Sequence, residues 1–268
     1  ATALRRTVRA QESTAAAIDA VGRGVRLPAD EALAAERAAF LALKSSDQAR
    51  ALRHIFFAER ATLADPRAKQ PPRPVTRIGV IGGGTMGAGI ASACLMRGFH
   101  VTLIERDETS LEAGANRVRG TLDSSAKRSL LPDLDAVVAR FETATDYAAL
   151  ADADLVIEAA TEDESLKRKI FADIRDIVKD EVIVATNTST LSITRLAAAM
   201  RHPEKFMGMH FMNPVPRMQL VELIRGIATD NPTYEVVREL VFKLDKTPAV
   251  SEDFPAFIVN RILLPMIN

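Results

Sequence analysis

A glycine-rich segment, residues 78–87, constrains the possible folds of this chain more than any other stretch. Its apolar start, 78–81, predicts a buried strand, and Gly82, Gly84 and Gly87 follow at G-x-G-x-x-G spacing. That spacing gives a tight turn, then a close approach of the backbone to a pyrophosphate, then close packing of a helix on the strand. The free N–H groups at the start of such a helix attract phosphate. The segment therefore predicts a dinucleotide-binding turn in preference to a purely structural one.

The residues after this turn support that interpretation and indicate the cofactor. A helix is expected over 86–97 and a second strand over His100–Ile104, which ends beside Glu105. Glu105 lies 23 residues after Gly82, near the spacing of about 20 at which an acidic residue binds the adenosine ribose. Because a carboxylate repels a 2′-phosphate, Glu105 favours NAD over NADP, whereas Arg106 beside it would favour the phosphate.

Composition excludes several other classes of function. The 268 residues suit one large or two modest domains, and 35 Lys and Arg balance 35 Asp and Glu, so nothing points to nucleic acid. One cysteine, Cys94, and four histidines argue against a disulfide framework or a metal site, and suit a reducing compartment. The most apolar window, 78–104, is interrupted by glycines, Arg97 and His100, so no integral membrane segment is expected.

The chain is predicted to divide into four segments. Residues 1–64 are rich in Ala, Arg and Glu and are expected to be helical, and residues 65–74 contain four prolines, which predict a stiff linker. Residues 75–251 form the predicted dinucleotide-binding domain. Residues 252–268 begin a helical C-terminal domain, because the apolar run 257–268 reaches the last residue without a stop signal. We therefore expect a fragment, cut at both ends.

Two of the helices expected in the N-terminal segment can be placed along the sequence. One covers 32–44, and residues 45–48 (Ser-Ser-Asp-Gln) have the pattern of a capping box that opens the next helix at Ser45. The second helix carries an apolar stripe, which should pack against another element because it is too apolar for a solitary helix. The stripe consists of Leu52, Ile55, Phe56 and Leu63.

From Val75 onwards, strand and helix patterns alternate. After the first two strands, further strands are expected over 155–159, 181–186, 205–210, 218–224 and 247–250. Helices are expected over 106–127, 165–178, 192–200 and 231–244. Alternation of this kind produces right-handed βαβ units. The predicted fold class is therefore α/β, with a Rossmann-type, doubly wound and mostly parallel sheet.

Polar residues follow three of the predicted strands, where the carboxyl ends of a parallel sheet bind ligands. They lie in the stretches 158–162, 187–190 and 210–216. An enzyme that oxidises an alcohol by hydride transfer needs a base for the hydroxyl proton, and His210 suits this near neutral pH. Glu222, 12 residues later on a neighbouring strand, would hold the imidazole in one tautomer.

Each candidate also has a purely structural explanation. Taken alone, His210 would more often be a core histidine, Ser189 a helix cap and Asn260 an amide on a helix surface. Asn187 and Thr190 can equally be turn or capping groups. A functional interpretation therefore depends on the combination of segments and not on any one of them.

That combination resembles the L-3-hydroxyacyl-CoA dehydrogenases of fatty-acid β-oxidation. The segments are the glycine turn, Asn-Thr-Ser-Thr at 187–190, His-Phe-Met-Asn-Pro-Val-Pro at 210–216 with Leu-Val-Glu-Leu-Ile at 220–224, and Phe-Ile-Val-Asn-Arg at 257–261. They follow the order and spacing of that family. Residues 46–60 also resemble the connector of multifunctional proteins that join an enoyl-CoA hydratase to the dehydrogenase. Residues 1–64 would then end a hydratase-type domain, whose catalytic residues are not in this chain.

The resemblance implies roles for individual residues. His210 matches the catalytic base and Glu222 its partner, while Ser189 and Asn260 match residues that contact the substrate. The positions that match NAD-binding residues are Gly82, Gly84, Met86, Gly87, Glu105, Ala160, Thr161, Glu162, Lys167, Ser189 and Asn213. The family often has Asp at position 105, and the longer Glu105 should still bind a ribose diol. Cations for the phosphates of CoA would come from Arg117, Arg119, Lys127 and Arg128.

The implied reaction is the NAD-dependent oxidation of a (3S)-3-hydroxyacyl-CoA to a 3-ketoacyl-CoA. The implied partners are a thiolase subunit, or a second copy of the chain joined through the C-terminal domain. A cytoplasmic bacterial protein is expected, with the peroxisome as the alternative. Three rival interpretations stay open: an NAD-binding fragment with little activity, a structural relative such as some lens crystallins, and a different Rossmann oxidoreductase that acts on a small β-hydroxyacid.

Overall fold

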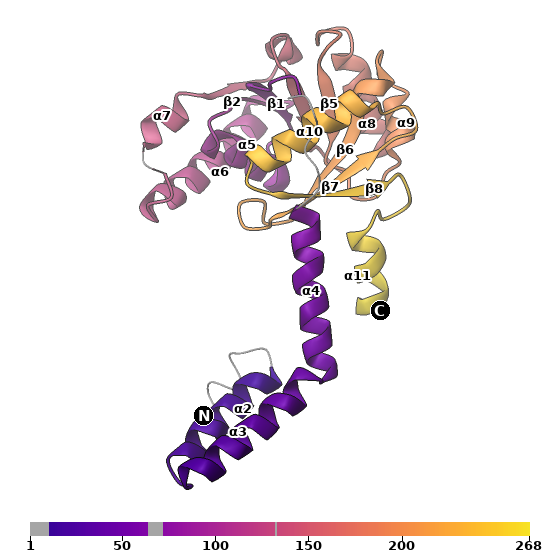
Figure 1. Ribbon diagram of the computed structural model, residues 1–268. Coiled ribbons are helices and arrows are strands. Elements are labelled where there is room, and N and C mark those ends of the chain that lie inside the picture. Colours follow the sequence, from indigo (N-terminus) through magenta and orange to yellow (C-terminus); the bar gives the residue numbers. More distant parts are fainter. Residues whose placement is uncertain (1–10, 64–71, 132) are drawn as a thin grey trace. The chain divides into compact units, whose positions relative to one another are not determined.

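The computed structural model describes residues 11–63, 72–131 and 133–268. Contacts within the chain divide it into two compact units, Ala1–Pro66 and Arg67–Asn268. The expected linker 65–74 lies largely outside the described residues. The first unit contains the helices α2 (Glu12–Gly24), α3 (Ala29–Lys44) and α4 (Asp47–Leu63) (Figure 1). Helices were the expected structure of this segment.

The capping box expected at Ser45 is wrong by one residue. Helix α3 continues to Lys44, so Ser45 follows its last turn and donates its hydroxyl to the carbonyl of Leu41 at 3.0 Å. Ser46 instead opens α4, because its hydroxyl accepts a hydrogen bond from Ala49 N–H at 3.2 Å.

The apolar stripe of α4 is exposed. Leu52, Ile55 and Phe56 are between 44 % and 53 % exposed. The expected packing of this stripe against another element is therefore not met by the described residues.

The second unit is built on one sheet of eight strands in the order β3-β2-β1-β4-β5-β6-β7-β8. Neighbouring strands are parallel throughout, except that β6 and β7 are antiparallel. The strands are β1 (Arg77–Ile81), β2 (His100–Ile104), β3 (Phe141–Ala144), β4 (Leu155–Glu158), β5 (Ile183–Thr186), β6 (Phe206–Phe211), β7 (Leu220–Arg225) and β8 (Thr247–Glu252). The predicted α/β fold with a mostly parallel, doubly wound sheet is confirmed.

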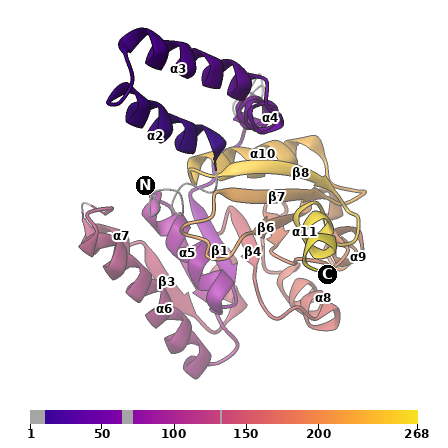
Figure 2. The same ribbon diagram turned by 90° about the horizontal axis from the view of Figure 1, so that it is seen from below.

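Helices cover both faces of this sheet and bury two apolar cores (Figures 1 and 2). On one face, α5 (Thr85–Met96), α6 (Glu108–Lys127) and α10 (Asn231–Lys243) pack on strand side chains such as Val80. On the other face, α8 (Glu164–Ile174) and α9 (Ile193–Ala197) pack on Val156 and its neighbours. The remaining α-helices of this unit are α7 (Leu134–Val138) and α11 (Val259–Ile267), and two short 3-10 helices cover Tyr147–Leu150 and Pro203–Lys205. Among the described helices, none combines the length and the apolar character that crossing a membrane requires.

Every predicted strand is present, and β3 is an additional one. Its two middle residues are exposed and its two end residues are partly buried, so it lacks the buried apolar run that identifies an inner strand. Helix α6 starts later than predicted because Asp107 caps it, accepting a hydrogen bond from Ser110 N–H at 2.7 Å. Helix α8 ends at Ile174, four residues before the predicted end.

The turn between β1 and α5 depends on a close backbone contact. Gly82 has φ +98°, a conformation that favours glycine. A Cβ atom on Gly87 would lie 1.7 Å from the carbonyl oxygen of Gly82, whereas a Cβ on Gly84 would meet no atom within 4 Å. Gly87 is therefore required for the packing of α5 on β1, and Gly84 leaves open space at the same turn.

Substitutions at Gly87 and Gly84 test whether the close backbone contact at Gly87 stabilises the turn. We expect Gly87→Ala to lower the free energy of unfolding by at least about 2 kcal/mol, because the added methyl group overlaps a backbone carbonyl. Gly84→Ala is the matched control and should leave the urea midpoint within error. Urea unfolding monitored by circular dichroism measures both, and an unchanged midpoint for Gly87→Ala would contradict the packing argument.

Candidate active site

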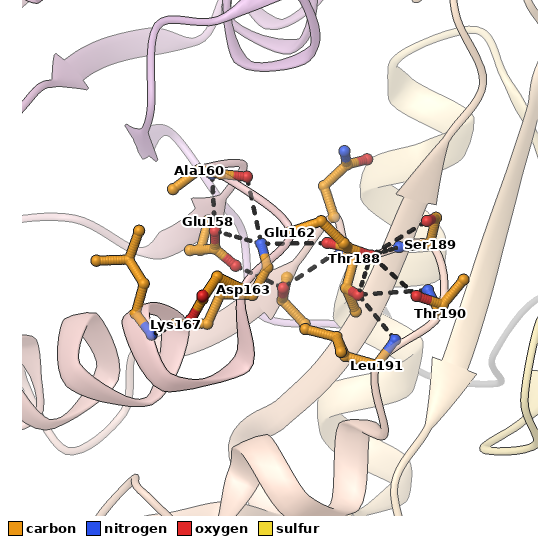
Figure 3. Close-up of polar contacts among 12 residues, drawn as sticks. Glu158, Ala160, Glu162, Asp163, Lys167, Thr188, Ser189, Thr190 and Leu191 are labelled. Atoms are coloured by element: carbon orange, nitrogen blue, oxygen red, sulfur yellow. Dashed lines mark hydrogen bonds and ion pairs between the residues drawn. The ribbon is translucent and has the colours of Figure 1, made fainter.

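A buried carboxylate at the end of β4 ties this strand to its neighbours (Figure 3). Glu158 is fully buried, and its Oε1 accepts hydrogen bonds from Lys167 Nζ at 2.6 Å and from Ala160 N–H at 2.7 Å. Its Oε2 accepts from the Thr186 hydroxyl, at the end of β5, at 2.6 Å. Lys167 is only 1 % exposed. Both charges thus have the ion-pair and hydrogen-bond partners that burial requires.

Glu162 connects this pair to the segment after β5 (Figure 3). Its Oε2 lies 3.6 Å from Lys167 Nζ, and its Oε1 accepts from the Thr188 hydroxyl at 2.6 Å and from Ser189 N–H at 2.7 Å. The Ser189 hydroxyl donates to the same oxygen at 3.1 Å. Burial raises the pKa of Glu162, but these hydrogen bonds and the Lys167 charge outweigh it, so the pKa lies below its ordinary value. Glu162 is thus an anion that fixes Ser189.

His210 and Glu222 form a buried pair across the antiparallel strands β6 and β7. The strand register places the two residues directly opposite each other, and His210 Nδ1 lies 2.6 Å from Glu222 Oε2. His210 is 8 % exposed and Glu222 is fully buried. Since a carboxylate can only accept, Nδ1 carries the proton of this hydrogen bond, which in a neutral imidazole leaves the lone pair on Nε2. The pair has the geometry of a histidine base oriented by an acid.

The other oxygen of Glu222 holds the start of α11. Oε1 accepts hydrogen bonds from Ile258 N–H at 2.9 Å and from Val259 N–H at 2.8 Å. Burial raises the pKa of Glu222, but the hydrogen bonds from His210, Val259 and Ile258 lower it by more than burial raises it. The pKa of Glu222 therefore lies below its ordinary value. The Phe257 ring lies 6.0 Å from the His210 ring, centroid to centroid.

Two asparagines form hydrogen bonds at the same edge of the sheet. Asn260 Nδ2 donates to the carbonyl of Ser189 at 3.3 Å, so these two candidates are in contact. Asn187 Oδ1 accepts from Phe211 N–H at 2.9 Å and fixes the end of β6, which agrees with its structural interpretation. Across residues 11–63, 72–131 and 133–268, no group of three or more His, Cys, Asp and Glu residues could hold a metal ion.

The glycine turn fits a dinucleotide. The first bond of α5 runs from Ala88 N–H to the carbonyl of Gly84 at 2.9 Å, so the N–H groups before it have no acceptor within the helix. Glu105 Oε1 accepts a hydrogen bond from Gly83 N–H at 2.7 Å, which places the carboxylate beside the turn. The Arg106 side chain pairs with Asp107 at 2.9 Å. The acidic residue, and not the arginine, therefore faces the turn, as NAD requires.

A cavity of about 510 Å³ adjoins the turn, between α5, α6 and the loop after β6. Its lining includes Asn213 and three arginines, Arg117, Arg128 and Arg217, and no acidic residue. Two of the predicted cations, Arg117 and Arg128, thus line the cavity, whereas Arg119 and Lys127 do not.

The third arginine of this cavity, Arg217, was missed. Its only sequence signal was its position directly after the 210–216 stretch. Arg117 also donates to the carbonyl of Gly83 at 3.0 Å, so α6 contacts the glycine turn directly.

Loss of the buried ammonium should destabilise the protein. We expect Lys167→Met to cost about 3–5 kcal/mol of unfolding free energy, because it leaves Glu158 buried without a counter-ion. Lys169→Met, two residues along α8, removes an exposed ion pair with Asp173 and should cost less than about 1 kcal/mol. Adding Glu158→Gln to Lys167→Met should recover part of the loss. Equal denaturation midpoints for the two lysine variants would refute the argument.

The lowered pKa of Glu222 predicts a pH-dependent contribution to stability. A carboxylate with a folded-state pKa below its unfolded value of about 4.3 stabilises the protein above that pH, and the contribution is lost as pH falls through the folded pKa. Glu222→Gln should therefore differ most from the wild type above about pH 5 and converge with it in acid. Urea unfolding from pH 3 to pH 7 tests this, with the exposed Glu112→Gln as the charge control. A difference that is constant with pH would contradict it.

Comparisons with known proteins identify the family. The family model "3-hydroxyacyl-CoA dehydrogenase, NAD binding domain" matches residues 77–254. A 3-hydroxybutyryl-CoA dehydrogenase of Bradyrhizobium diazoefficiens is 52 % identical over 196 residues, which cover 72 % of this chain and 67 % of the relative. The fatty acid oxidation complex subunit alpha of Acinetobacter baylyi is 36 % identical over 251 residues, and there the match covers 92 % of this chain but only 35 % of the relative.

A solved structure agrees with these sequence matches. The (S)-3-hydroxybutyryl-CoA dehydrogenase of Ralstonia eutropha superimposes with a TM-score of 0.71 at 44 % identity, over 73 % of this chain and 70 % of that one. The expected resemblance is thereby confirmed, and with it NAD as the cofactor. The chain belongs to the 3-hydroxyacyl-CoA dehydrogenase family of NAD-dependent oxidoreductases.

Proposed function

We propose that this chain oxidises (3S)-3-hydroxyacyl-CoA to 3-ketoacyl-CoA in fatty-acid β-oxidation, with His210 as the catalytic base and Glu222 as its partner. The observation that carries the proposal is the buried His210–Glu222 pair, whose nitrogen and oxygen lie 2.6 Å apart at the carboxyl end of β6. This is the edge of the sheet at which ligands of such folds bind.

The pair can accept the proton of a substrate hydroxyl. Because Nδ1–H donates to Glu222, the free lone pair of Nε2 takes the proton from the 3-hydroxyl oxygen. The imidazolium that forms faces an anionic carboxylate, which offsets the new positive charge. Bound NAD would supply the acceptor for the hydride that leaves C3. Ser189 and Asn260, which contact each other, would orient the substrate oxygen.

The cofactor would lie on the glycine turn and along the strand ends. Gly82, Gly84, Met86 and Gly87 would hold the pyrophosphate, and Glu105 the adenosine ribose. The strand-end residues Ala160, Thr161, Glu162, Ser189 and Asn213 would line the rest of the site. Lys167 would act through its ion pairs with Glu158 and Glu162, since its side chain is 1 % exposed.

The arginine-lined cavity supports an acyl-CoA over a small β-hydroxyacid. Coenzyme A carries a diphosphate and a 3′-phosphate, and Arg117, Arg128 and Arg217 line a cavity of about 510 Å³ with no acidic residue. A small acid would need one cation and far less space. We therefore assign the CoA phosphates to this cavity.

The proposed wider setting is a longer multifunctional protein. Residues 1–64 would end a hydratase-type domain, 65–74 link it to the dehydrogenase, 75–251 bind NAD, and 252–268 begin a helical C-terminal domain. The relatives named fatty acid oxidation complex subunit alpha support this, because the chain spans about a third of one such relative, 35 %. The proposed partner is a thiolase subunit or a second copy of the chain, and the proposed location is the bacterial cytoplasm.

The experiment that tests the function is NADH oxidation at 340 nm with acetoacetyl-CoA as the ketone. We expect His210→Gln to lower kcat by about 10²-fold to 10⁴-fold, the usual contribution of a general base. His100→Gln is the matched control, because this histidine is exposed at the start of β2 and should leave the rate unchanged.

Three results would lead to other conclusions. Full activity of His210→Gln would reject the proposed base. A chain that binds NADH but turns over only when extended beyond residue 268 would be an NAD-binding fragment of the enzyme. Binding of NADH without turnover at either length would favour the structural interpretation.

A further inference from the structure

A buried lysine outside the proposed catalytic pair holds the loop that lines the cavity. Lys246, between α10 and β8, is 8 % exposed. Its Nζ donates to the carbonyl of Val215 at 2.6 Å and to the carbonyl of Met218 at 2.7 Å. Among the described residues, no carboxylate oxygen lies within 4.0 Å of this ammonium. Burial lowers the pKa of Lys246 below its ordinary value.

Such an arrangement is unusual for a buried charge. Removing an ammonium from water is costly unless it is paired and hydrogen-bonded, and a carboxylate is the common partner. Here the partners are two backbone carbonyls, so the interaction fixes the backbone and not another side chain. Two strong hydrogen bonds from one charged donor define the position of each carbonyl closely.

The two carbonyls bracket Arg217. Within the loop, Arg217 N–H and Met218 N–H both donate to the carbonyl of Pro214 at 3.0 Å, so the backbone forms a tight turn. Val215 is 2 % exposed and packs on α5, where a Cβ on Gly89 would lie 3.0 Å from Val215 Cβ. Fixing residues 215 and 218 therefore determines the direction in which the Arg217 side chain leaves the turn.

We propose that Lys246 is a positioning residue for acyl-CoA: through the carbonyls of Val215 and Met218 it holds Arg217 toward the cavity, where the guanidinium binds a CoA phosphate. The inference rests on the proposed function, since it takes CoA as the ligand of that cavity. Lys246 itself does not line the cavity.

Binding measurements on the full chain test this role. Coenzyme A binding is measured by calorimetry and NADH binding by fluorescence, for the wild type, Lys246→Met and Lys243→Met. Lys243 is the matched control, because it is exposed in the last turn of α10. We expect Lys246→Met to weaken CoA binding about tenfold, since the loop loses both fixed carbonyls, and to change NADH binding less than about threefold. Lys243→Met should change neither.

A double-mutant cycle asks whether Lys246 acts through Arg217. If it does, Lys246→Met should weaken CoA binding by less than about twofold in a protein that already carries Arg217→Gln, because the phosphate contact is then absent. Additive losses of CoA affinity would show that Lys246 acts by another route and would overturn the proposal.

Further outcomes would also overturn the positioning role of Lys246, and one of them would reject the proposed function as well. Wild-type CoA affinity in folded Lys246→Met removes the positioning role and leaves the proposed function intact. Equal losses of CoA and NADH affinity in Lys246→Met would show that Lys246 has only a structural role. Absence of CoA binding by the wild type would reject both proposals. Should Lys246→Met not fold, Lys246→Gln, which is shorter and uncharged, must also weaken CoA binding, and unchanged affinity would again reject the role.

Discussion

The register between β6 and β7 is the constraint on which the candidate active site depends. In this antiparallel pair His210 lies opposite Glu222, so the strand ladder itself brings the imidazole and the carboxylate together. A shift of one residue would turn one of the two side chains to the other face of the sheet. That register is enforced from both faces, because Met209 packs in one apolar core and Ile224 in the other. The cores thus position the proposed base.

Much of the fold could be predicted because short apolar runs indicate buried strands and glycines indicate tight turns. Most of the strands that the sequence revealed are inner strands, such as β4, whose residues are all buried. The exception is the edge strand β8, which was also predicted. Strand β3 is an edge strand whose side chains are partly exposed, so only its pairing with β2 defines it. The cap of α4 was displaced by one residue because Ser45 and Ser46 are both suitable caps, and the end of α3 decides between them.

The candidate site was predictable where an acid lies on the strand next to that of a histidine, and not where a side chain finds its partner only in the folded chain. His210 and Glu222 were paired from their spacing, and the structure brings them to 2.6 Å. No spacing rule indicates that Lys167 pairs with a glutamate in the preceding strand. Nor does one indicate that Lys246 binds carbonyls about 30 residues earlier, at 2.6 Å and 2.7 Å. The sequence shows that a lysine carries a positive charge, but only the fold shows which groups accept its hydrogen bonds.

Glu222 also shows that the candidate site extends past the part of the chain that the family model matches, which ends at residue 254. One oxygen of this buried carboxylate orients His210, and the other accepts from Ile258 and Val259, at the start of α11. Without those two donors the buried oxygen would lose its hydrogen bonds, at a cost of about 1–3 kcal/mol, and the ionised form of Glu222 would be less favoured. A less ionised Glu222 would stabilise the imidazolium less. The segment that begins α11 is therefore part of the machinery of the proposed base, although it contributes only backbone N–H groups to it.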